Sequence, residues 1–203
     1  MTIYQNLLGE DFQRLHPKLQ KRYALRKDKP FCAAGKMTSV QTGPWWLLPF
    51  LRLAAQWKFL FPESGKDIPF TIKNTCRTLP SGLDEVYWER TFYFDNATRH
   101  FNAFMTIDSE RKVVRDYLGE PKLFYSDLYF DVLPDGSLVI RSGAQRFVMG
   151  KIEIPIPKLF EGVVEVKEGY DHVREAFTIN VHIHNRLIGR LMTYEGEFNE
   201  ETN

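Results

Sequence analysis

The sequence has few cysteines and little imbalance of charge. Its two cysteines among 203 residues, Cys32 and Cys76, lie far apart and lack the close Cys or His spacing of a zinc site. We therefore expect reduced, structural thiols. The 27 basic residues nearly balance the 26 acidic ones, which leaves no overall field to attract nucleic acid or anionic lipid. Nucleic-acid binding is accordingly not expected.

Targeting and membrane-spanning patterns are also lacking. The first residues hold no basic segment followed by an apolar core, so no signal peptide is expected and a cytoplasmic location is predicted. The longest apolar run covers residues 45–60, and Arg52, Gln56 and Lys58 interrupt it. Because a bilayer span takes about 20 apolar residues, this run predicts no transmembrane helix.

Residues 45–60 instead predict an amphipathic helix. Arg52 and Gln56 are four positions apart and share one helical face, which leaves a broad apolar surface over the remainder. We expect this helix to pack across a sheet or into the mouth of a barrel. The alternative is a lid, or a helix that touches a membrane or a protein partner.

The most informative residue present is Arg90, which lies in the apolar row of a predicted strand. Side chains alternate between the two faces of a strand, so one row holds Val86, Trp88, Arg90, Phe92 and Phe94. A guanidinium removed from water is costly unless an anion compensates it. Arg90 therefore marks either an internal ion pair, with Asp116 or Asp127, or a seat for an anionic ligand.

The pattern changes once along the chain. Residues 1–60 are predicted to be mainly helical, with helices over Ile3–Leu8 and from Pro17 through Tyr23, and one early strand within residues 32–42. Residues 68–199 show almost only strand patterns. Predicted hairpin loops lie at Asp95–Ala97, Pro134–Gly136, Gly169–Asp171 and Asn185–Arg186. Consecutive strands without helical crossovers predict a meandering antiparallel sheet or barrel.

Several strands carry apolar side chains on both faces, unlike a sheet that is wetted on one side. Between residues 123 and 133, Phe124 and Leu128 belong to one row, while Tyr125 and Tyr129 belong to the other, which Asp127 interrupts. Covering both faces requires a helix layer, a ligand cavity or a partner. The N-terminal helices can supply one of these covers.

Four groups of residues give the chain a resemblance to a known family. They are Tyr4–Gly9 with Leu15–Pro17, Trp88–Phe92, Asp116–Gly119 with Pro121, and Ile154–Pro157 with Leu187–Gly189 and Tyr194–Gly196. On these residues the chain resembles the bacterial family called domain of unknown function 4166. The resemblance spans nearly the whole chain and implies one domain, without implying an activity. Members commonly carry glutamate where this chain has Asp116, whose shorter side chain reaches less far toward Arg90.

Patterns typical of metal sites and of catalysis are weak. His182 and His184 share one face of a predicted strand, but the sequence dictates no third ligand, so no metal site is predicted. The chain has no GxSxG elbow, GxGxxG turn or P-loop. No cofactor is expected, no catalytic residue is assigned, and a non-enzymatic protein is favoured.

These patterns together predict a single α+β domain over residues 1–203, with N-terminal helices packed on a long, curved antiparallel sheet or partly closed barrel. The first functional hypothesis is binding of a small apolar or amphiphilic anionic ligand, such as a fatty or isoprenoid acid, in a cavity. The predicted ligand-binding residues are Trp88, Arg90, Phe92, Asp116, Trp45 and Trp46. Two alternatives stay open: an enzyme that uses an arginine and a carboxylate in the cavity, and an interaction module that docks on a membrane partner through residues 45–60.

Overall fold

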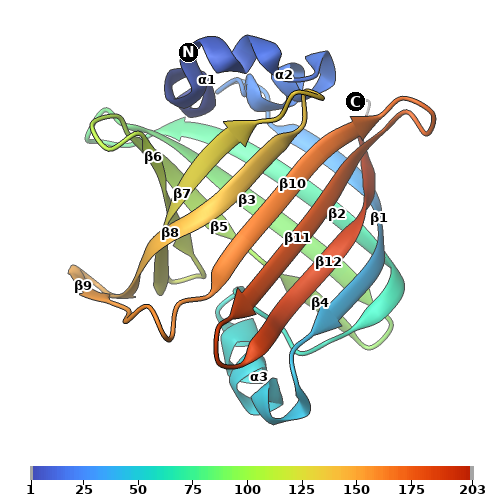
Figure 1. Ribbon diagram of the computed structural model, residues 1–203, viewed down its shortest axis with the longest axis vertical. Helices are drawn as coiled ribbons and strands as arrows, with labels where there is room; N and C mark the ends of the chain where they lie inside the picture. The colour runs from blue at the N-terminus through green and yellow to red at the C-terminus, as the bar shows by residue number, and fades with distance from the viewer. Residues whose placement is uncertain (1, 202–203) are drawn as a thin grey trace.

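Antiparallel strands occupy most of the chain after residue 30 in the computed structural model of the protein, which describes residues 2–201 (Figure 1). The strands are β1 (Phe31–Thr42), β2 (Gly65–Thr78), β3 (Asp84–Phe94), β4 (Ala97–His100), β5 (Ala103–Asp108), β6 (Val113–Leu118), β7 (Phe124–Val132), β8 (Leu138–Met149), β9 (Ile152–Pro155), β10 (Val163–Asp171), β11 (Ala176–Asn185) and β12 (Gly189–Glu200). From β2 onward, short turns and loops join them, as the sequence predicted.

Short helices precede β1 and follow it. They are α1 (Ile3–Leu8), the 3-10 helix η1 (Gly9–Arg14), α2 (Pro17–Tyr23), η2 (Trp45–Leu47) and α3 (Leu48–Gln56). The bounds predicted for the first two α-helices are confirmed. Thr2 and Gln5 form a capping box at the start of α1, and Gly9 ends it with a positive φ. Pro17 occupies the first turn of α2, where its missing N–H costs nothing.

The sheet closes completely into a barrel. It has twelve strands, and because β4 and β9 stand outside the ring, ten strands form the wall. They run in the order β10-β11-β12-β1-β2-β3-β5-β6-β7-β8, and β8 then pairs with β10. Every pairing is antiparallel, so the predicted barrel is confirmed.

The seam between β8 and β10 has few ladder pairs. Strand pairing there covers only Leu138–Arg141 opposite Glu165–Glu168. Beyond it, β8 continues to the outlying hairpin with β9, and side chains replace the ladder: Gln145 exchanges two hydrogen bonds with the backbone of Gly162. The two prolines of Ile154–Pro157 thus lie at and beyond an edge strand, in agreement with the sequence.

The helices of residues 1–60 do not form one layer. Figure 1 shows α1 and α2 at one end of the barrel and α3 at the other. The reason is β1, which is 12 residues long and carries the chain from one end of the wall to the other. The segment 45–60 therefore sits at a barrel mouth, where Leu51 is buried and Phe50 is exposed.

One predicted loop is wrong. Gly169–Asp171 belongs to β10, and the turn follows at residues 172–175. The Asp171 carboxylate accepts hydrogen bonds from the backbone N–H groups of Val173 and Arg174, so this aspartate begins the turn rather than ending it.

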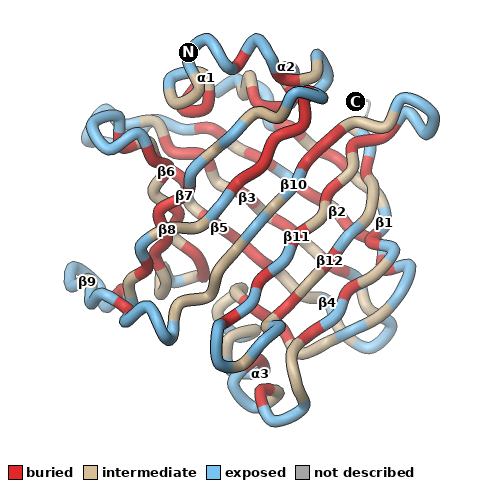
Figure 2. Tube along the Cα trace, viewed as in Figure 1, coloured by how far each residue is buried: buried red, intermediate tan, exposed pale blue. Residues whose placement is uncertain are grey.

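Closure also explains the strands that are apolar on both faces. One row of each strand faces the barrel interior and the other faces outward, so buried and exposed stretches alternate along β11 and β12 (Figure 2). On β7, Leu128 is buried inside, whereas Tyr129 is exposed outside. No helix layer covers that outer face within the described residues; the Arg146 guanidinium lies over the Tyr125 ring instead.

Candidate functional site

A cavity of about 60 Å³ lies inside the barrel. Two residues that line it, Trp88 and Met105, contact Tyr4 of α1, whose hydroxyl accepts a hydrogen bond from Trp88. Two others, Phe101 and Phe124, pack against Phe59, which follows α3. The wall of the cavity is mostly apolar. Its polar lining residues are Arg90, Asp116, Ser126, Gln145, Glu168 and Tyr194.

Arg90 projects from β3 into this cavity. Its Nε donates to the carbonyl oxygen of Phe101 at 2.8 Å, and its guanidinium lies 4.2 Å from the centre of the Phe101 ring. A longer hydrogen bond of 3.4 Å joins Nη1 to the Tyr194 hydroxyl. Arg90 is 8% exposed and has no ion pair with any residue in the range 2–201. The groups in direct contact with the Arg90 guanidinium are thus two neutral acceptors and the rings of Phe101 and Trp88.

Asp116 reaches the same cavity from β6. Its carboxylate forms no side-chain hydrogen bond in the described part of the chain, and the buried Oδ1 has no partner at all. Burial in apolar surroundings raises the pKa of Asp116 to about 7, against the opposing attraction of Arg90. An aspartate in this state can hold a proton near neutral pH. Its side chain can therefore either donate or accept a hydrogen bond inside the cavity.

The internal ion pair of the barrel is formed by other residues. Arg22, at the end of α2, reaches into the barrel and donates from Nε and Nη2 to the two carboxylate oxygens of Glu168, at 2.9 and 3.0 Å. Both side chains are 1% exposed, and the Tyr23 hydroxyl also donates to Glu168. Burial disfavours the charge on Arg22, but the attraction of Glu168 prevails and raises the Arg22 pKa.

The structure brings three of the six predicted ligand-binding residues to the cavity. Trp88, Arg90 and Asp116 line it, whereas Phe92 does not. Phe92 points inward but packs against the rings of Phe61, Phe70 and Tyr194 nearer the α3 end.

Trp45 and Trp46 lie outside the barrel. Their exposed fractions are 80% and 45%, and they belong to η2 at the barrel mouth. Leu47 and Leu51 are the buried residues of the two helical turns there. The apolar run in the sequence could not show which of its faces meets the barrel.

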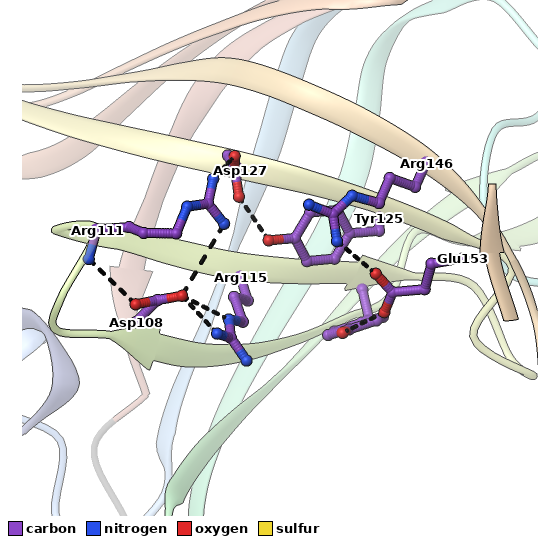
Figure 3. A network of polar contacts seen from close by, with 8 residues as sticks. Asp108, Arg111, Arg115, Tyr125, Asp127, Arg146 and Glu153 are labelled. Carbon is purple, nitrogen blue, oxygen red and sulfur yellow. Dashed lines mark hydrogen bonds and ion pairs between the residues drawn. The ribbon is translucent and has the colours of Figure 1, made fainter. Parts of the chain in front are cut away.

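Asp127, the other carboxylate considered for Arg90, lies on the outer face of the wall. It binds Arg111 and accepts a hydrogen bond of 2.5 Å from the Tyr125 hydroxyl (Figure 3). Ser126 and Leu128 both line the cavity, so Asp127 between them points to the opposite face of β7. Asp127 therefore takes part in a surface network that continues through Arg146 and Glu153.

Glu168 and Arg22 were missed by the sequence analysis. Glu168 had the same pattern as Arg90, since it follows Val164 and Val166 in one row of its strand and all three line the cavity. Arg22 gave no such pattern, because a basic residue in the last turn of a short helix is usually solvated.

The two histidines of β11 give no support to a metal site. His182 and His184 are exposed on the outer face. Within residues 2–201, no group of three or more His, Cys, Asp or Glu side chains is arranged to hold a metal ion.

Two comparisons with known proteins give matches. The family model described as "Domain of unknown function (DUF4166)" matches residues 15–198. The chain is also 40% identical over 200 residues to the protein described as "Uncharacterized protein YndH" of Bacillus subtilis (strain 168), covering 98% of this chain and 97% of that protein. No solved structure matches. Among the described residues, no helix is both long and apolar enough to cross a membrane.

Proposed function

The chain belongs to the DUF4166 family, and we propose that it binds a small carboxylic acid with an apolar tail inside the barrel. The observation that carries the proposal is that Arg90 and Asp116 face one apolar cavity and leave each other unpaired. A ligand carboxylate supplies what both lack. It accepts hydrogen bonds from the planar guanidinium of Arg90 and a further one from protonated Asp116.

The size of the cavity narrows the ligand class. A volume of about 60 Å³ is well below the roughly 300–1,000 Å³ of sites for drug-sized ligands. It suits a carboxylate and the first carbons of a tail. A longer tail, as in a fatty or isoprenoid acid, fits only if side chains around the cavity move.

Calorimetric titration with straight-chain acids of increasing length tests the proposal. We expect binding that Arg90→Met abolishes and Arg90→Lys weakens, because lysine keeps the charge but loses the planar fork. Arg115→Met, which removes an arginine from the outer face of β6, is the control and should bind as the parent does. Thermal melting of each variant identifies loss of folding.

Native mass spectrometry of gently purified protein gives an independent readout. A stoichiometric acid that disappears in folded Arg90→Met supports the proposal. If no acid of the series binds the parent, or if folded Arg90→Met binds as well as the parent, the proposal fails.

A second candidate is an enzyme that uses Asp116 as a general acid or base. It is favoured by the pKa of about 7 for a buried carboxyl with an unpartnered oxygen, since catalytic groups titrate near the working pH. Turnover of a bound acid that follows one titration near pH 7 and is lost in Asp116→Asn would establish it. If the bound acid is recovered unchanged, the enzyme candidate fails and the binding function is kept. The cytoplasmic location stays a prediction in either case.

A further inference from the structure

Exposed apolar side chains gather at one end of the barrel. Of the 15 large hydrophobic residues exposed within residues 2–201, four lie on residues 45–53, six on residues 147–160, and one is Leu187. These segments are η2 with α3, the β8–β9 hairpin with the loop after it, and the β11–β12 turn. We call these eleven side chains the aromatic rim. Figure 1 shows the three segments at the end opposite α1 and α2.

Large aromatic side chains of the rim are mostly exposed. Trp45 is 80% exposed, Phe50 68% and Phe160 65%. Figure 2 shows the β8–β9 hairpin and the β11–β12 turn as exposed stretches. Exposed apolar side chains that gather at one end of a protein are typical of a binding surface.

Basic side chains without partners accompany the rim. Arg52, Lys151, Lys158 and Arg186 are exposed on the same segments, and none has an ion pair with a described residue. Residues 45–57, 147–162 and 186–188 hold two acidic residues, Glu153 and Glu161, and Arg146 neutralises Glu153. The four unpaired basic residues therefore outnumber the one acidic residue that is left, Glu161. A chain with a net charge of +1 thus carries a local positive excess at its most apolar end.

We propose that the aromatic rim docks on the surface of an anionic lipid bilayer. Tryptophan and phenylalanine enter the interfacial layer of a bilayer, while lysine and arginine attract anionic head groups. Neither contribution alone gives stable attachment, and the rim combines both. A second copy of the chain fits less well, because a two-fold interface would bring two copies of the same positively charged surface together.

Docking through the aromatic rim is independent of the ligand proposed for the barrel. It rests on exposure and charge at the mouth, whereas the ligand site rests on Arg90 and Asp116. Failure of one proposal leaves the other standing, because vesicle binding and acid binding are measured separately.

Sedimentation of the full chain with vesicles tests the proposal. We expect the protein to bind vesicles of phosphatidylcholine mixed with phosphatidylglycerol, to bind pure phosphatidylcholine much less, and to shift its tryptophan emission to the blue on binding. Trp45→Ser with Phe160→Ser should abolish binding. The matched control, Leu83→Ser with Val173→Ser, removes exposed apolar residues from outside the rim and should bind as the parent does.

Charge reversal tests the electrostatic part. Lys151→Glu with Lys158→Glu should lower the partition coefficient roughly tenfold or more, since each basic residue contributes separately near an anionic surface. Lys29→Glu with Lys73→Glu, which reverses exposed charges elsewhere, should change it little.

Three results would overturn the proposal. The first is no binding to the mixed vesicles. The second is equal loss in the rim variants and their controls. The third is a dimer, measured by light scattering, that Trp45→Ser with Phe160→Ser dissociates while vesicles bind no protein.

Discussion

Arg90 and Asp116 face the same internal cavity from β3 and β6 and form no ion pair with each other. Arg22 and Glu168, which line or border the same interior, form a bidentate pair of 2.9 and 3.0 Å. The barrel therefore contains one neutralised pair and one arginine and carboxyl that remain available. The available groups are where ligand chemistry is expected.

Replacing Asp116 by Asn should change how stability depends on pH. The folded-state pKa of about 7 exceeds the roughly 4 of an unfolded aspartate, so between these values the native protein holds more proton than the unfolded chain. The parent is therefore fully stabilised below about pH 4 and loses stability as the pH rises to about 7. Asp116→Asn has no carboxyl to ionise, so above pH 7 its free energy of unfolding should exceed that of the parent by up to about 4 kcal/mol.

Urea unfolding of both proteins at a series of pH values measures this difference. Asp108→Asn is the control of opposite sign, because the Arg115 guanidinium holds the pKa of Asp108 below its usual range. The stability that Asp108 contributes is present above the unfolded pKa and is lost as the pH falls through the folded one. A difference between parent and Asp116→Asn that does not vary from pH 4 to pH 7 would contradict the prediction.

Affinity for a carboxylic acid should fall as the pH rises above about 7. Protonated Asp116 donates to the ligand carboxylate, whereas ionised Asp116 repels it, so affinity should drop about tenfold per pH unit above the Asp116 pKa. Asn at this position donates an N–H at any pH, and Asp116→Asn should bind with equal affinity at pH 6 and pH 9. Calorimetry at both pH values checks this. A parent whose affinity is unchanged at pH 9 would show that Asp116 does not contact the ligand.

Removing Glu168 should destabilise the protein strongly. Glu168→Gln leaves the Arg22 guanidinium buried without a counter-ion, at a cost of about 3–5 kcal/mol. Arg22→Met combined with Glu168→Leu should recover most of the loss, since neither charge is then buried. Lys21 lies on α2 next to Arg22 and forms an exposed ion pair with Glu200 of β12. Lys21→Met breaks that pair and should cost less than about 1 kcal/mol. Chemical denaturation provides all three values, and equal costs for Glu168→Gln and Lys21→Met would refute the difference.

Adding a methyl group where β1 pairs with β12 should disrupt the barrel wall. A Cβ on Gly35 would overlap the carbonyl oxygen of Glu197, and one on Gly196 would overlap that of Lys36. Both obstacles are backbone and cannot rotate away, so Gly35→Ala and Gly196→Ala should each cost at least about 3 kcal/mol. Gly162→Ala is the control, because its nearest neighbour is a side-chain carbon 3.5 Å away. Gly35→Ala with the parental melting temperature would be the contrary result.

Local patterns predicted much of the fold correctly. Helix α1 ends just before Gly9 and α2 begins at Pro17, as predicted. These features depend on a few neighbouring residues, such as a glycine that tolerates positive φ. The loop predicted over Gly169–Asp171 was wrong because Asp171 is the last residue of β10 and starts the turn that follows. In the sequence, an aspartate that starts a turn looks the same as one inside a loop.

The sequence by itself determined that Arg90 lies on an apolar face, since alternation along one strand is enough to show it. It did not determine what surrounds Arg90, because that depends on side chains brought together by closure of the ring. Tertiary structure alone decided that Asp116 lies inside without a partner, that Asp127 turns outward, and that Arg22 enters the barrel to neutralise Glu168. Pairing of buried charges is a contact between distant strands and helices, and no local pattern records it.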